Sequence, residues 1–288
     1  MAHSLAQLWQ SIRRRWLYAL LAIAVTFGLV VTQPQPSHAQ PRWFDLLLRG
    51  VQIFQLSNLS DNQEVALGRQ INQQLTARQF RLYREPTITD YVNRIGQRLV
   101  PHSERPQIPY TFQVVDSTQV NAFATMGGFV YVTTGLMRTA ENEAELASVI
   151  SHEIGHIAER HAVKQMRERA IQGGIATAAG LDRNAAVAIG VELALNRPNS
   201  RQDELEADQD GLQTLVGAGY APQAMVTFMQ KLLNRRGGSP PTFLSTHPAT
   251  GDRITRLESS LRQLNISQGD GLDPAAYRDR IRPLLRQG

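Results

Sequence analysis

Two histidines and a glutamate stand close together near the middle of the chain, in Ser151-His152-Glu153-Ile154-Gly155-His156, which reads H-E-x-x-H. Residues four apart share one face of a helix, so His152 and His156 would present their imidazoles side by side. Imidazoles at this spacing can take adjacent corners of a Zn²⁺ tetrahedron. Glu153 lies next to both, where its carboxylate can accept a proton from a water molecule on the metal. Chance alone can produce this pattern, so the zinc hypothesis needs a third ligand from elsewhere in the chain.

The residues around the motif are typical of a helix that packs into a core, because apolar residues recur at helical spacing from Leu146 to Ile157. Thr139 is a candidate N-cap, and three glutamates follow it in the first turn, where the helix dipole favours negative charge. The helical pattern starts at Glu141 and continues to Met166. His161 falls five residues after His156 and leaves the metal face, so we interpret it as a structural or surface residue.

A second acidic segment, residues 199–208, predicts the third ligand. Ser200 can cap a helix in which Glu204 and Asp208 lie one turn apart on one face. Glu204 could complete a His₂Glu site that leaves the fourth position to water, and Asp208 could orient a ligand imidazole from outside. Glu206 is the main rival to Glu204. An acidic helix on its own is more often a solvent-exposed face.

The N-terminal segment predicts export. In residues 1–39, Arg13-Arg14-Arg15 precede an apolar run and Ser37-His38-Ala39 offers a cleavage site before Gln40, as in a secretory signal peptide. The alternative is an uncleaved N-terminal anchor in the membrane. In either case the rest of the chain lies outside the cytoplasm, in the periplasm or another extracytoplasmic compartment. The absence of Cys excludes disulfides and a thiol mechanism.

Composition bounds the remaining organisation. The chain has 288 residues and a net charge of +5, which falls to about +2 once the three arginines of residues 1–39 are removed. This charge is too weak to indicate nucleic-acid binding. We expect an amphipathic segment at 40–60, one main domain at 61–265 that carries the H-E-x-x-H motif, and a C-terminal tail at 266–288. Residues 42–59 could contact a membrane surface, or equally pack against the domain.

The fold class expected is α+β and mostly helical, with a small antiparallel sheet beside the H-E-x-x-H helix. Helices are predicted from residue 61 to about 80 and from 87 to about 100, and strands at 110–116 and 128–134, where side chains alternate. A strand just before a zinc helix could bind an extended peptide by edge pairing. The Ala- and Gly-rich residues 170–196 predict two helices that cover the active site or touch a membrane.

Four separated motifs resemble one family in their order along the chain. They are the stretch NAFATMGGFVYVTTGLM, then HEIGH, then S-R-x-x-E-x-E-A-D, then Ser245-Thr246-His247-Pro248-Ala249-Thr250 with Arg253. The pattern resembles the gluzincin zinc metallopeptidases of the HtpX and CAAX prenyl protease 1 family, and most of all its soluble, exported BepA-like branch. The resemblance covers roughly residues 60 to 265. It implies one zinc per chain, held by His152, His156 and Glu204, with Glu153 as base and Asp208 as the helical partner of Glu204.

The function expected is a zinc-dependent endopeptidase acting on unfolded or misfolded exported proteins, in protein quality control. His247, Arg201 and Arg253 are candidates for a second donor to the oxyanion of the reaction. The resemblance also implies that His247 can bind the metal as a fourth ligand and hold the enzyme off, so it is a candidate switch. The alternatives are a chaperone or scaffold with a vestigial or silenced peptidase site, and a binding module that uses the strand edge alone. Glu153 argues against both, because a binder has no use for a base.

Overall fold

The fold is described from a computed structural model, which covers residues 53–54, 58–173, 181–196, 198–234, 241–248, 251–266 and 268–286. These residues belong to one compact unit, Val51–Gly288. The predictions for residues 1–39, and those for most of 40–60, lie outside the described residues. Among the helices of the described ranges, none has both the length and the apolar character needed to cross a membrane.

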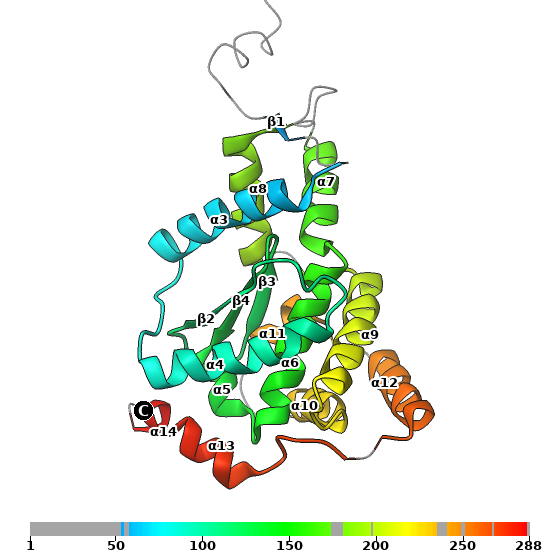
Figure 1. The fold of residues 1–288 in the computed structure, drawn as a ribbon. Helices are drawn as coiled ribbons and strands as arrows, with labels where there is room; N and C mark the ends of the chain where they lie inside the picture. The colour runs from blue at the N-terminus through cyan, green and yellow to red at the C-terminus, as the bar shows by residue number, and fades with distance from the viewer. Residues whose placement is uncertain are drawn as a thin grey trace, which may run out of the picture. The chain divides into compact units, whose positions relative to one another are not determined.

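Most of the described chain is helical, with a small sheet beside helix α6, so the predicted α+β class is confirmed (Figure 1). The helices are α3 Asp61–Arg78, α4 Pro86–Leu99, η1 Val100–His102, α5 Thr134–Thr139, α6 Glu143–Ala158, α7 His161–Gln172, α8 Arg183–Asn196, α9 Arg201–Gly217, α10 Gln223–Asn234, α11 Thr242–Thr246, α12 Gly251–Leu264, α13 Pro274–Arg280 and α14 Arg282–Leu285. The strands are β1 Ile53–Phe54, β2 Thr111–Val115, β3 Ala122–Thr125, β4 Phe129–Thr133 and β5 Leu181–Asp182.

The predicted sheet is present, but it is mixed rather than antiparallel. Its strand order is β2-β4-β3, with β4 parallel to β2 and antiparallel to β3. Strand β3 was not predicted from the sequence. Gly127 and Gly128 have φ angles of 77° and 94°, which let β3 and β4 join in a tight hairpin. Because β3 takes the antiparallel position on one side of β4, β2 pairs on the other side.

Helix α6 carries the H-E-x-x-H motif and is buried over nearly its whole length. It begins after Asn142, whose side chain accepts a hydrogen bond from the N–H of Glu145, and not after Thr139, which ends α5. The helix predicted to continue to Met166 is broken. After α6 ends, Arg160 adopts a left-handed conformation with φ 58° and ψ 33°, and α7 begins as a separate helix.

Two glycines bring α6 and α9 into backbone contact. A Cβ atom on Gly155 of α6 would stand 2.7 Å from the carbonyl oxygen of Ala207 in α9. A Cβ on Gly211 of α9 would stand 3.0 Å from the backbone N of His152. This close approach sets the distance between the two histidines of α6 and the acidic face of α9. The other neighbours of α6 include β3, β4, α4 and α10.

Two further segments for which the sequence made predictions are residues 170–196 and residues 266–288. Residues 183–196 form α8, which packs against α3 and α7, whereas residues 174–180 lie outside the described part. Residues 266–288, expected as a tail, add α13 and α14 to the core instead. The Tyr277 hydroxyl donates to the carbonyl of Met137 at 2.7 Å, and Leu284 is fully buried.

We expect Gly155→Ala to destabilise the protein, because the added methyl group must push α6 and α9 apart. Overpacking of about 1–3 kcal/mol should exceed the gain of about 1 kcal/mol in helix propensity. Urea denaturation should show a lower transition midpoint. Gly251→Ala at the start of α12 is the matched control, since no described atom lies within 4 Å of its added Cβ. A Gly155→Ala protein as stable as wild type would show that the helices can separate freely.

Candidate metal centre

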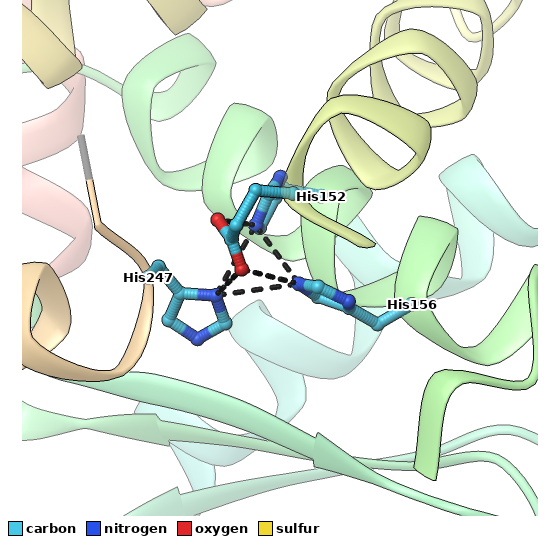
Figure 2. Close-up of side chains that lie close together, drawn as sticks. His152, His156 and His247 are labelled. Carbon is cyan, nitrogen blue, oxygen red and sulfur yellow. Dashed lines mark hydrogen bonds and ion pairs between the residues drawn. The ribbon is translucent and has the colours of Figure 1, made fainter. Parts of the chain in front are cut away.

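Four side chains from three parts of the chain converge at one buried place. Helix α6 supplies His152 and His156, α9 supplies Glu204, and the turn after α11 supplies His247. Figure 2 shows the three labelled histidines pointing toward one another. The two histidines of α6 and the glutamate of α9 are the three ligands predicted from the sequence, and the structure brings them together.

The spacing of the four ligand atoms fits a tetrahedral metal ion. Nε2 of His152 and Nε2 of His156 are 3.1 Å apart, and Nδ1 of His247 lies 3.3 Å from each. The Glu204 carboxylate oxygens lie 3.0 Å from Nδ1 of His247, 3.3 Å from Nε2 of His156 and 3.4 Å from Nε2 of His152. Ligands held about 2.0–2.1 Å from a tetrahedral Zn²⁺ are about 3.3–3.4 Å from one another. The donor types and their distances therefore fit zinc.

The electrostatics of the cluster also favour a cation. Burial opposes the charged form of His152, but hydrogen bonding with Asp208 and Glu204 outweighs it and raises the pKa of His152 to about 9. Burial lowers the pKa of His156 well below its usual range. Burial also works against the carboxylate form of Glu204, yet attraction to His247 and hydrogen bonds with His152 and His156 hold its pKa far below its usual range. The buried carboxylate of Glu204 is therefore stabilised by a positive charge beside it, which a proton or a metal ion can supply.

Asp208 and Arg253 connect two of the candidate ligands. Oδ1 of Asp208 lies 3.0 Å from Nδ1 of His152, the nitrogen that faces away from the cluster. The Arg253 guanidinium donates to both oxygens of Asp208 at 2.6 and 2.7 Å and lies 2.5 Å from Oε2 of Glu204. Asp208 therefore occupies the outer position predicted for it. Arg253, a candidate oxyanion donor by sequence, holds carboxylates in place instead.

Glu153 lies beside the cluster with its side chain fully buried. Within the described residues, neither of its carboxylate oxygens accepts a hydrogen bond, and the nearest charged-type contact is Nε2 of His247 at 3.4 Å. Burial raises the pKa of Glu153 above its usual range. A carboxylate that is buried and short of partners binds a proton readily, which is the property a general base needs.

Asn199, and not Arg201, lies beside the histidines of the cluster. Arg201 is largely exposed and forms an ion pair with Asp252, so this contact does not place it at the cluster. Asn199, to which no role was assigned, brings Nδ2 to 3.3 Å from Nε2 of His156 and 3.2 Å from Nδ1 of His247. Gln165 orients this amide by donating to Oδ1 of Asn199 at 2.7 Å. No sequence signal singles out Asn199, because asparagines are common in turns before helices.

His161 lies closer to the cluster than its spacing predicted, and Glu206 lies beside it. His161 is buried, with its Nδ1 2.8 Å from Nδ1 of His156. Glu206 stays outside the cluster, and its Oε2 lies 3.0 Å from Nε2 of His161. Hydrogen bonding with His161 lowers the pKa of Glu206 to about 2. The break at Arg160 is the local feature that brings His161 back to His156, and an uninterrupted helical pattern gave no sign of it.

A largely apolar pocket opens beside the cluster. Glu153, His156 and His247 line one part of it. Apolar side chains from β3, the turn after β3 and α8 line the rest, including Phe123, Met126 and Leu193. In the described sheet β3 is an edge strand, paired with β4 on one side only. An extended segment lying along β3 would therefore pass close to Glu153.

Comparison with known proteins agrees with this geometry. The model of peptidase family M48 matches residues 86–261, which include every side chain of the cluster. The chain is 34% identical over 223 residues to the "Beta-barrel assembly-enhancing protease" of Escherichia coli (strain K12), covering 72% of this chain and 46% of that protein. It therefore spans about half the length of such curated relatives.

Two further relatives carry names of metallopeptidases. "Mitochondrial metalloendopeptidase OMA1" of Schizosaccharomyces pombe is 30% identical over 185 residues, covering 62% of this chain and 55% of that protein. "Metalloprotease LoiP" of Escherichia coli (strain K12) is 28% identical over 252 residues, covering 84% of this chain and 96% of that protein. The second of these alignments covers nearly the whole of the relative.

We expect about one zinc ion per purified chain, because the donor set is that of a single tetrahedral site. His152→Ala and His156→Ala should lose the metal, and Glu204→Gln should bind it more weakly. Elemental analysis of the dialysed proteins measures this. His102→Ala is the matched control, since His102 is an exposed histidine in η1 and should leave the zinc content unchanged. Full zinc in His156→Ala would contradict the ligand assignment.

Proposed function

This chain belongs to peptidase family M48, and from that premise we propose that it is a zinc-dependent endopeptidase that cleaves exported proteins. One observation carries the proposal. His152, His156 and Glu204 meet at a buried point with the spacing of zinc ligands, and the carboxylate of Glu153 stands beside them without a hydrogen-bond partner among the described residues. A site that only stored a metal would not need a buried base next to it.

The chemistry divides between the metal and the chain. Zinc bound in such a site supplies a water of lowered pKa and polarises a carbonyl. Glu153 accepts the proton of the attacking water and later delivers it to the leaving amine. Asp208 and Arg253 keep His152 and Glu204 in position through the contacts described above. No Ser nucleophile is needed, and the chain has no Cys to act as one.

The substrates proposed are unfolded or misfolded proteins of the cell envelope. Three observations support this: the signal-like residues 1–39, the name of the relative that enhances β-barrel assembly, and the open edge of β3 beside Glu153. A substrate would add to β3 as an extended strand and place an apolar side chain in the neighbouring pocket. Release into the periplasm, or an anchor formed by residues 1–39, stays a prediction, as does membrane contact through 42–59.

We propose that His247 is a removable fourth ligand. Its Nδ1 occupies the corner of the cluster that a water would otherwise take, at 3.0–3.3 Å from the other three ligand side chains. A neutral imidazole is a good zinc ligand, so this arrangement corresponds to a resting state. The resting enzyme would be opened when the segment carrying His247 withdraws. This regulation also accommodates the alternative of a chaperone whose peptidase site is kept off.

Replacing Glu153 distinguishes a peptidase from a chaperone or scaffold. We expect Glu153→Gln to keep its zinc and lose at least about 10²–10³-fold in peptide or casein cleavage, because glutamine cannot accept the proton. The wild-type and variant proteins are compared after both have been shown to contain equal zinc. The same variant, expressed in the native compartment, should trap substrates for identification by mass spectrometry. Equal cleavage by the two proteins would exclude this mechanism and favour a chaperone or scaffold.

Removing the His247 imidazole tests the proposed resting state. His247→Ala should keep its zinc, held by three ligands, and should cleave peptides several-fold faster than wild type because water gains the fourth position. Cleavage rates and zinc content are measured on the same preparations. Lower activity with full zinc would instead identify His247 as a donor to the reacting carbonyl and remove the basis for a switch.

A further inference from the structure

We propose that His161 and Glu206 are positioning residues that hold the metal ligand His156 in a single tautomer and orientation. They form a chain of hydrogen bonds in which the Glu206 carboxylate holds the His161 imidazole, and His161 holds the His156 imidazole. The inference rests on the proposed function, because it concerns the same metal. It assigns roles to two residues that the proposed reaction does not use.

The break between α6 and α7 makes this contact possible. In a continuous helix, a residue five positions after His156 would point about 140° away from it around the axis. The left-handed conformation of Arg160 ends α6 and restarts the chain as α7, so His161 returns toward His156. The two Nδ1 atoms lie 2.8 Å apart, and the side chain of His161 is only 1% exposed. A buried contact this short requires one donor and one acceptor.

The positions of the nitrogens fix where each proton belongs. Nε2 of His156 faces the cluster and must keep a free lone pair to bind a metal, so its Nδ1 carries the hydrogen. That Nδ1–H donates to Nδ1 of His161, whose own hydrogen must therefore sit on Nε2. Nε2–H of His161 then donates to Oε2 of Glu206 at 3.0 Å. The opposite tautomer of His161 would set two N–H groups against each other at 2.8 Å.

The chain of hydrogen bonds from His156 to Glu206 resembles the arrangement at His152, the other candidate ligand on α6. Nδ1 of His152 faces the carboxylate of Asp208 directly, whereas Nδ1 of His156 reaches the carboxylate of Glu206 through one imidazole. Both ligands are thus linked to an anion outside the cluster, which fixes the ring and raises the basicity of the nitrogen that binds the metal. Both carboxylates belong to α9, the helix that also supplies Glu204.

A second metal site is the competing explanation, since Glu159, His161 and Glu206 lie close enough together to hold an ion. Lys164 argues against it. Its ammonium lies 3.4 Å from Oε2 of Glu159 and 3.3 Å from Oε2 of Glu206, so a cation already stands between the two carboxylates. Both nitrogens of His161 have partners as well. The group is therefore better explained as support for His156.

The test measures zinc affinity by competition with a chelator, not turnover. His161→Phe keeps the ring and removes both nitrogens, and we expect its zinc dissociation constant to rise by about 10–100-fold. His161→Asn can still accept from Nδ1–H of His156 through its amide oxygen, so it should recover most of the affinity. The zinc dissociation constant of Glu206→Leu should lie between those of His161→Phe and His161→Asn. Lys164→Met is the matched control, because it removes an exposed contact of Glu206 and leaves the chain of hydrogen bonds intact.

A spectroscopic measurement reports on the hydrogen bond itself. In the zinc-loaded protein, NMR of ¹⁵N-labelled histidine should show the Nδ1–H of His156 as a slowly exchanging proton. The signal should persist in His161→Asn and disappear or exchange rapidly in His161→Phe. A purely structural role of His161 would lower the melting temperature of the metal-free protein without changing this signal.

The outcomes are distinct. Unchanged zinc affinity in both His161→Phe and Glu206→Leu, with any loss confined to stability, would overturn the proposal and leave the proposed function standing. A wild-type protein that binds no zinc would overturn both. If His161→Phe does not fold, Glu206→Leu decides alone, since Glu206 is partly exposed and its loss should not unfold α9. Zinc affinity weakened in Lys164→Met as much as in Glu206→Leu would show that the charge of this surface matters and the hydrogen-bond chain does not.

Discussion

The backbone contact between α6 and α9 is the constraint on which the rest of the site depends. Gly155 and Gly211 lack the Cβ atoms that would hold the two helices apart, so Ala207 and His152 can lie against them. At this separation the short carboxylate side chains of α9 can reach the imidazoles of α6. Helices that pack through larger side chains, with axes 8–10 Å apart, would leave Glu204 and Asp208 too distant to reach the imidazoles of α6.

This packing buries charges that need compensation. Glu204, Asp208 and Glu153 are all shielded from water, and an isolated carboxylate in such a place is unstable. Arg253 from α12 neutralises two of them with geometrically matched hydrogen bonds, and it also donates to the carbonyl of Pro248 at 3.1 Å. Glu153 is left without such a partner among the described residues. Arg253 therefore compensates the candidate metal ligand Glu204 and its neighbour Asp208, whereas burial leaves the pKa of Glu153, the proposed base, above its usual range.

Hydrogen bonds and ring packing attach the segment that carries His247 to the rest of the described chain. The N–H of Phe243 donates to the carbonyl of Val120, and the N–H of Asn199 donates to the carbonyl of Thr246. The ring of Phe243 stacks on His247 with centroids 4.6 Å apart. Arg253 contacts both Glu204 and the backbone carbonyl of His247. Movement of this segment would therefore also move the group that holds Glu204 in place. Arg253 therefore links His247, the proposed switch residue, to the candidate metal ligand Glu204.

The sequence by itself determined the helical parts of the site, and the tertiary structure decided the rest. His152, His156, Glu204 and Asp208 could be predicted because helical periodicity relates residues four apart, whatever surrounds them. The pairing of β2 with β4, the packing of residues 266–288 and the role of Arg253 depend on contacts between distant segments, which no local pattern encodes. His161 illustrates the boundary. Its spacing predicted a side chain pointing away from the metal, and the left-handed conformation of a single residue, Arg160, turned it toward His156.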